Sequence, residues 1–175
     1  MQDPQTTNNF ERLVLPHLDA AYNLARWLTR RQHDAEDVVQ DAYLRAFNAF
    51  PQFQGGDARC WLLTIVRNAC YTWLHRNRER VPTASFDESV HDVPTGTLEP
   101  ADLLQQRIEG DALRRAIEQL PVEFREALIL REFEGLSYQE IAAVADVPIG
   151  TVMSRLARAR QRLASSISVR ALKEA

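Results

Sequence analysis

The spacing of apolar residues is the feature that most limits what this chain can form. Apolar residues recur at the three- and four-residue intervals of a helix in most windows of the 175 residues, and no strand-like alternation persists. The sequence therefore predicts an all-α fold. The pattern predicts helices near residues 10–31, 34–50 and 58–77, with interruptions at Pro16 and in "PQFQGGD", residues 51–57.

A change in composition divides the chain into two helical blocks. Residues 81–102, "VPTASFDESVHDVPTGTLEPAD", are rich in proline, threonine, serine and acidic residues and show no sustained period. Such a composition is typical of a flexible linker. We expect two small helical domains, residues 1–80 and 103–175, joined by this flexible acidic linker.

The second block contains four helix patterns, and the last two predict a helix-turn-helix. Ser137 and Glu140 have the spacing of a capping box, which predicts a short helix from Ser137 to Ala145. Asp146 tolerates left-handed backbone and Pro148 prevents the first helix from continuing, so a new helix is expected near residue 149. In this motif the N-terminal residues of the second helix lie nearest the bases in the major groove.

The last helix is expected to have two different faces. Its predicted inward stripe consists of Ile149, Val152, Met153, Leu156, Ala159 and Leu163. Its predicted outward face consists of Thr151, Ser154, Arg155, Arg158 and Arg162. The arginines alone would fit the solvated face of an ordinary bundle. The capped helix, the short turn and the one-sided basic face together favour DNA binding.

The first block carries a second basic segment. Residues 58–80, "ARCWLLTIVRNACYTWLHRNRER", hold five arginines and one acidic residue, with tryptophan and tyrosine interleaved. Arginines that follow a backbone and aromatic rings that stack on unpaired bases are typical of single-strand binding. Trp61 shares a helical stripe with Leu62 and is expected in the core. Four other side chains are expected to be exposed: Tyr71, His75, Arg76 and Arg78.

The stretch "DAEDVVQDAYLRAF", residues 34–47, predicts a helix with one buried and one acidic face. The apolar stripe consists of Val39, Tyr43, Ala46, Phe47 and, just beyond, Phe50. The opposite side carries Asp34, Asp37, Asp41 and Leu44. An acidic face with an exposed leucine is unusual for a protein that also carries basic helices, and the net charge of −3 hides this segregation.

Three stretches of the chain resemble regions 2 and 4 of bacterial extracytoplasmic-function sigma factors. They are residues 34–47, the segment "WLLTIVRNACYTWLHRNR", and the run from "LPVEFREALILREFEGLSYQEIA" to "RARQRL". The resemblance implies a region 2-like domain, the flexible linker and a region 4-like helix-turn-helix domain. It also implies docking on the β′ clamp helices of RNA polymerase through Asp34, Asp37, Gln40, Asp41 and Leu44.

The same resemblance implies two DNA-reading sites. Asn68 and Tyr71 match positions that capture a base of the melted minus-10 element, with Arg76 and Arg78 near its backbone. The outward face of the last helix matches the minus-35 reader, with Thr151, Ser154, Arg155, Arg158 and Arg162. Two positions depart from the family pattern: Thr72 replaces a common acidic residue and Met153 replaces a common basic one.

The resemblance also implies partners. They are core RNA polymerase, through its β′ clamp helices and β flap, promoter DNA, and an anti-sigma factor. We expect no cofactor, no metal ion and no membrane insertion, and a cytoplasmic location. Because Cys60 and Cys70 accompany no CxxC or Cys/His spacing, we interpret both as small buried apolar residues rather than redox or metal-binding groups.

Three alternative functions predict different features. A sequence-specific regulator shares the pattern of the last four helices, since these also resemble response-regulator output domains, but it needs no acidic docking helix. A sigma-like decoy that titrates an anti-sigma factor predicts decayed DNA-binding faces, whereas the arginines are present. An enzyme is disfavoured because the sequence contains no P-loop, GxGxxG, HExxH or nucleophile elbow.

Overall fold

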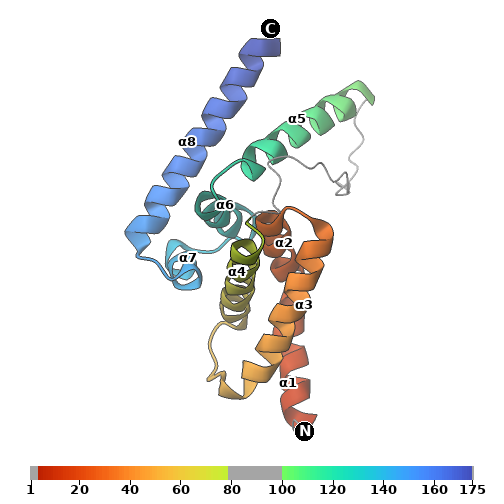
Figure 1. The fold of residues 1–175 in the computed structure, drawn as a ribbon, viewed down its shortest axis with the longest axis vertical. Coiled ribbons are helices and arrows are strands. Elements are labelled where there is room, and N and C mark those ends of the chain that lie inside the picture. The colour runs from red at the N-terminus through yellow and green to blue at the C-terminus, as the bar shows by residue number, and fades with distance from the viewer. Residues whose placement is uncertain (1–3, 79–99, 175) are drawn as a thin grey trace.

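A computed structural model describes residues 4–78 and 100–174, and all the regular structure in these two ranges is helical (Figure 1). The predicted all-α class is thereby confirmed. Most of the predicted linker lies outside the described residues. The last predicted linker residues are helical, because α5 begins at Pro100. No helix in the described ranges is both long enough and apolar enough to cross a membrane.

The first block forms four helices, α1 (Pro4–Val14), α2 (Leu18–Thr29), α3 (Gln32–Ala49) and α4 (Ala58–Arg76). The interruption predicted at Pro16 is confirmed, because it separates α1 from α2. Pro16 lies in the 3₁₀ turn η1 (Leu15–His17) between them, where its fixed φ and missing N–H are tolerated. Asp57 caps α4 by accepting hydrogen bonds from the backbone N–H groups of Arg59 and Cys60.

An aromatic cluster closes the end of this block where α1, α3 and α4 meet. The Phe10 ring stands edge-on to the rings of Phe47 and Phe50, at centroid distances of 5.2 and 5.3 Å. Trp61 is half-buried and packs against the core, with its ring 4.9 Å from Phe53 and 6.2 Å from Phe50, so its expected place in the core is confirmed only in part. Edge-to-face rings add to the energy of apolar burial.

The second block contains α5 (Pro100–Glu118), α6 (Val122–Leu128), α7 (Tyr138–Ala145) and α8 (Ile149–Glu174). A π-helical turn, η3 (Ile129–Phe133), continues α6. Both hydrogen bonds of the predicted capping box are present, at 2.6 and 3.2 Å between Ser137 and Glu140. Asp146 ends α7 with a left-handed φ of 54°, so the predicted helix-turn-helix is confirmed.

The inward stripe of α8 is narrower than predicted. Val152, Leu156 and Ala159 are buried and Leu163 is half-buried. Met153 is 54% exposed and Ile149 is also exposed, so the prediction that these two face inward is wrong. Met153 lies one residue from Val152, about 100° around the helix, which turns it away from the core.

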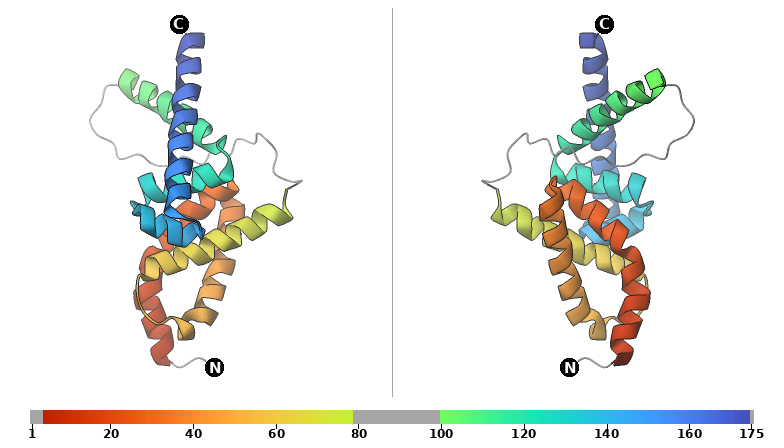
Figure 2. Two further views of the ribbon diagram at one scale, coloured as in Figure 1. Left: turned by 90° about the vertical axis from the view of Figure 1, so that its left-hand side faces the viewer. Right: turned by 90° about the vertical axis from the view of Figure 1, so that its right-hand side faces the viewer.

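The two blocks pack against each other and share one hydrophobic core. α2 contacts α6, and α4 contacts α7 (Figure 2). The core cluster runs from Leu24 and Leu62 in the first block to Leu128 and Ile141 in the second. The sequence predicted the linker between the blocks. It did not predict the contact between them, because the residues that meet there are far apart along the chain.

Candidate polymerase and nucleic-acid interfaces

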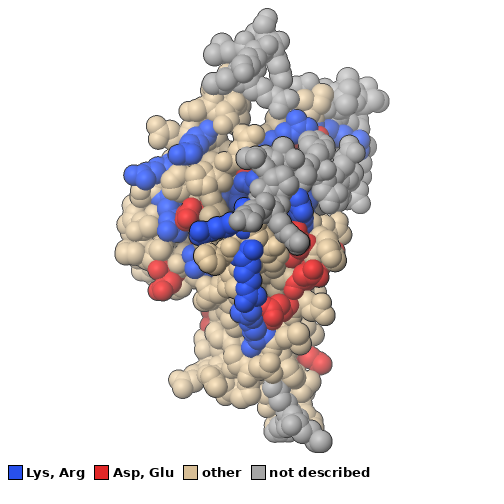
Figure 3. Space-filling model, viewed as in Figure 1, with Lys and Arg blue, Asp and Glu red and all other residues tan. Residues whose placement is uncertain are grey.

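The acidic face of α3 is exposed, as its pattern predicted. Asp37, Gln40 and Asp41 are exposed, Leu44 is 59% exposed, and Asp34 is half-buried. These residues lie along one side of α3, on which the acidic side chains in Figure 3 also gather. The face therefore combines negative charge with an unburied leucine, a combination that suits a protein partner.

Two side chains of α3 lie close to these aspartates. Arg45 lies 2.8 Å from Asp41, and His33 lies 3.6 Å from Asp37, each one helical turn away. Both pairs are well exposed, so they contribute little to stability and are readily exchanged for charges on a partner.

An apolar groove of about 450 Å³ lies between α2 and α3 beside the acidic face. Its lining includes Leu18, Tyr22, Val39 and Tyr43. Leu18 is exposed, and the sequence analysis did not identify it. The turn at Pro16 resets the helical register before Leu18, so periodicity alone could not show which way this leucine faces.

The predicted minus-10 residues of α4 fall into two groups. Asn68, Arg76 and Arg78 are exposed, as expected for a nucleic-acid surface. Tyr71 is half-buried and its hydroxyl donates a 2.8 Å hydrogen bond to Glu126 Oε2 of α6, so its predicted exposure is wrong. Burial and the neighbouring Glu126 carboxylate raise the pKa of Tyr71 well above its usual value.

The predicted minus-35 residues of α8 are similarly divided. Ser154, Arg158 and Arg162 are exposed and Thr151 is half-buried. Arg155, predicted to face outward, is only 20% exposed, and its Nη1 lies 3.8 Å from Glu126 Oε2. The prediction was wrong because helical periodicity does not show that the buried carboxylate of Glu126, on the neighbouring helix α6 of the same block, lies beside this arginine.

Glu126 therefore connects the two basic surfaces. Its side chain is buried, and it accepts hydrogen bonds from Arg67 Nε at 2.6 Å and from the Tyr71 hydroxyl, with Arg155 close by. A buried carboxylate is costly unless it is paired, and these donors meet that need. Arg67 also lies over the Tyr71 ring, 4.0 Å from its centroid.

Glu134, just after η3, makes a second contact between the blocks. It accepts hydrogen bonds from Arg59 Nη2 at 2.9 Å and from Asn23 Nδ2 at 2.7 Å. Beside it, the Phe133 ring packs 5.5 Å from the Trp27 ring. Neither Glu126 nor Glu134 could be identified from sequence patterns, because each sits in an ordinary amphipathic pattern and its hydrogen-bond donors belong to the other block.

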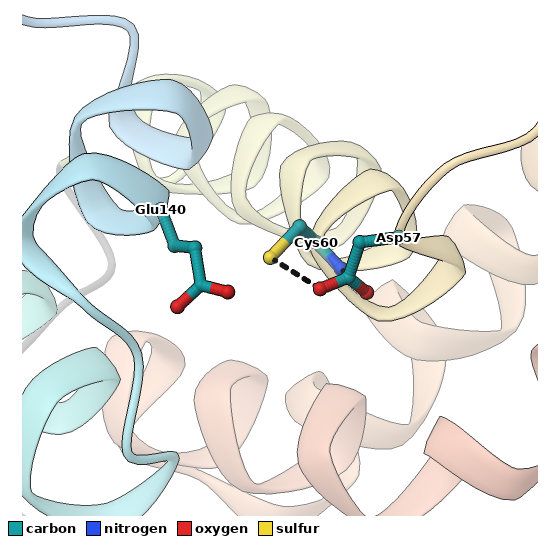
Figure 4. A group of neighbouring side chains, drawn as sticks. All are labelled: Asp57, Cys60 and Glu140. Atoms are coloured by element: carbon teal, nitrogen blue, oxygen red, sulfur yellow. Dashed lines mark hydrogen bonds between the residues drawn. The ribbon is translucent and has the colours of Figure 1, made fainter.

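Cys60, Asp57 and Glu140 come together where α4 meets α7 (Figure 4). One potential ligand atom from each lies within 4.8 Å of the others, and the Cys60 thiol donates a 3.3 Å hydrogen bond to Asp57. Both carboxylates cap helices, and burial with the nearby carboxylates raises the pKa of Cys60 to about 12. The predicted burial is confirmed for Cys70 but wrong for half-buried Cys60, which has polar neighbours.

Charges of opposite sign occupy different parts of the surface. In Figure 3 most basic side chains lie on the side of α8 and in the middle of the view, and the largest group of acidic side chains lies on the α3 side, where basic side chains adjoin it. Such a surface can bind a basic protein site and a phosphate backbone at once, although the net charge is slightly negative.

Two family models match the chain. Sigma-70 region 2 matches residues 13–80, and Sigma-70, region 4 matches residues 110–163. The chain is 37% identical to the ECF RNA polymerase sigma factor SigE of Mycolicibacterium smegmatis, over 92% of this chain and 62% of that protein's length. It is 37% identical to the ECF RNA polymerase sigma-E factor of Escherichia coli, over 77% of this chain and 74% of that protein.

Two solved structures have similar folds. The sigma factor RpoE of Bartonella quintana, in complex with the anti-sigma factor NepR, superposes with a TM-score of 0.71 at 33% identity, covering 92% of this chain and 98% of that one. CnrH, in complex with the cytosolic domain of CnrY, superposes with a TM-score of 0.65 at 26% identity, covering 93% and 90%.

Proposed function

This chain belongs to the extracytoplasmic-function RNA polymerase sigma factors, and we propose that it is a transcription initiation factor that binds core RNA polymerase and directs it to specific promoters. The observation that carries the proposal is the coexistence of an exposed acidic and apolar face on α3 with arginine-bearing faces on α4 and α8. A plain DNA-binding regulator has no need of the α3 face. Bond making belongs to the polymerase, so the chain itself is not an enzyme.

The proposed polymerase contact is the α3 face with Asp34, Asp37, Gln40, Asp41 and Leu44. We place it against the β′ clamp helices, with the β flap as a second contact for the region 4-like block. The exposure of Leu44 and the adjoining groove support this assignment, since an apolar centre with a charged rim is typical of a protein interface.

The proposed promoter contacts lie on two helices. On α4, Asn68 and Tyr71 hold a base of the melted minus-10 element, while Arg76 and Arg78 contact its backbone. Extruding a base costs a few kcal/mol of stacking, which a fitted pocket offsets without ATP. On α8, the minus-35 element is read by Thr151, Ser154, Arg155, Arg158 and Arg162.

We also propose control by an anti-sigma factor in the cytoplasm. The support is that the RpoE and CnrH structures, which this fold resembles, contain an anti-sigma factor and the cytosolic domain of CnrY, respectively. The compact contact between the two blocks offers such an inhibitor a surface to stabilise.

In vitro transcription tests the proposed function. Purified bacterial core polymerase and a pool of promoter fragments are incubated with and without this protein. We expect products only when the protein is present, with start sites that share minus-35 and minus-10 elements. Stable core binding without products would favour a decoy, and neither core binding nor products would overturn the proposal in favour of a plain helix-turn-helix regulator.

A further inference from the structure

Two large apolar side chains at the start of α8 face solvent. Ile149 is 40% exposed and Met153 is 54% exposed, whereas Val152 between them is buried in the core. The two exposed residues are four positions apart, so they lie one above the other on the same side of the helix. A single exposed apolar residue is ordinary, but this pair lies on the helix that the proposed function places against DNA.

The pair occupies the part of the helix-turn-helix that comes nearest to base edges. α8 begins beside α7, just after the turn at Asp146, and runs away from it toward the C-terminus (Figure 1). The second helix of this motif contacts bases through its N-terminal residues. Ile149 is the first residue of α8, and Met153 lies about one turn further on. A long side chain on the exposed side of these turns is therefore within reach of the bases.

The exposed residues next to Met153 on α8 are small. They are Gly150, Ser154 and Ala157, which lie within about one turn of Met153. A Cβ atom added at Gly150 would have no neighbour within 4 Å, so the space in front of this turn is open. Small residues allow the helix to approach a groove closely, and Met153 then projects further than its neighbours.

The arginines of α8 do not supply a charge beside Met153. Arg155 and Arg158 lie about 160° and 140° around the helix from it. Arg160 is on the same side as Met153, but it lies about two turns further on and is paired with Glu132 at 2.8 Å. The contact that Met153 can make is therefore apolar, whereas the arginines provide the contacts to phosphate or to polar base edges.

Thymine presents the apolar group that fits such a side chain. In the major groove each base pair shows a pattern of donors and acceptors, and thymine adds a C5-methyl group. The thioether of methionine has no N–H or O–H to donate, so it cannot pair with the donors and acceptors as arginine or asparagine does. Its flexible and polarisable chain packs well on an apolar group of irregular position.

We infer that Met153 is a specificity-determining residue of this chain, which selects a thymine in the minus-35 element by packing its side chain on the C5-methyl group. Ile149 extends the apolar surface by one turn. The inference rests on the proposed promoter recognition and names a base that this recognition requires. Helical periodicity had placed Met153 in the core, so this role follows from its exposure in the structure.

Deoxyuridine tests the methyl group by itself, because it is thymidine without the C5-methyl group. In vitro transcription with core polymerase and the wild-type chain first identifies a promoter. Each thymine of its minus-35 element, on both strands, is then replaced singly, and competition mobility shifts measure the affinity of the complete polymerase complex. We expect at least one replacement to weaken binding about fourfold, as the loss of one buried methyl group does.

Variants of Met153 assign that methyl contact to its side chain. Met153→Ala should bind the thymidine and deoxyuridine forms of the promoter equally, because its side chain no longer reaches the methyl group. Met153→Leu keeps an apolar side chain of similar volume and should retain most of the discrimination, whereas the polar Met153→Gln should lose it. Ile167→Ala removes another exposed apolar side chain of α8, about 21 Å further along, and is the control that should discriminate like the wild type.

The outcomes separate this inference from the proposed function. If the wild type gives neither products nor a promoter complex, the proposed function fails and the role of Met153 fails with it. If the promoter complex forms, the role of Met153 is overturned by any of three results: a minus-35 element without thymine, no loss at any deoxyuridine, or undiminished discrimination by Met153→Ala. Core binding and circular dichroism show whether Met153→Ala is folded, and Met153→Gln replaces it in the comparison if it is not.

Discussion

At the scale of single residues, Asp37 and Asp41 show how a surface can matter for binding and not for folding. Both are exposed and their partners on α3 are exposed as well. Replacing them with arginine changes the sign of the face that is proposed to contact polymerase, while the core beneath it stays intact.

We therefore predict that Asp37→Arg combined with Asp41→Arg abolishes binding to core polymerase. Because exposed charges contribute little to stability, the midpoint of thermal unfolding should change by at most a few degrees. Native gels measure the first effect and circular dichroism the second. Asp146→Asn, which lies just after α7 and away from the α3 face, serves as a surface control. Normal core binding by the double variant would show that α3 is not part of the interface.

Arg155 is predicted to read a base of the minus-35 element. Arg155→Ala should weaken binding of the complete polymerase complex to its promoter by about 1 to 3 kcal/mol and relax the preference at one base pair. Arg160→Ala, on the same helix but paired with Glu132, is the control. An unchanged profile across promoter variants would show that Arg155 contacts no base.

Sequence patterns predicted which side chains face solvent more reliably than they predicted which residues those side chains contact. The exposed places of Asp37, Asp41, Arg76, Arg78 and Arg158 follow from helical periodicity alone. Tyr71 and Arg155 were misjudged because both meet a single buried carboxylate, Glu126, which lies in the other block from Tyr71 and on a neighbouring helix of the same block as Arg155. No local pattern distinguishes such a glutamate from a solvated one on an amphipathic helix.

At the scale of elements, the helix-turn-helix is set by local chemistry. Ser137 and Glu140 satisfy each other's backbone groups at the start of α7, and the left-handed Asp146 ends it. These are short-range effects, which is why the sequence predicted the start, the turn and the following helix correctly. The break at Pro16 was also predicted from local chemistry, and it separates α1 from α2.

We predict that Ser137→Ala lowers the free energy of unfolding by about 1 kcal/mol, because the backbone N–H of Glu140 loses its acceptor. Ser137→Asp should restore most of this loss, as aspartate also caps helices. Chemical denaturation measures both values. If Ser137→Ala unfolds like the wild type, the capping box contributes nothing to the stability of the motif.

At the scale of the whole molecule, two helical blocks share a core, and one residue of each proposed DNA-contacting set, Tyr71 and Arg155, meets the buried Glu126 carboxylate. Sequence patterns predicted the all-α class and the basic and acidic surfaces. They could not predict the packing of the blocks, because Glu126, Glu134 and Phe133 find partners in segments far away along the chain.

The measurement that tests the central claim most directly is a mobility-shift titration of a promoter fragment with core polymerase, this protein, or both. The account predicts a specific complex only when both are present, and its loss when Asp37→Arg and Asp41→Arg are introduced. A specific shift by the protein alone that core polymerase neither strengthens nor enlarges would contradict the account. The chain would then be a plain DNA-binding regulator.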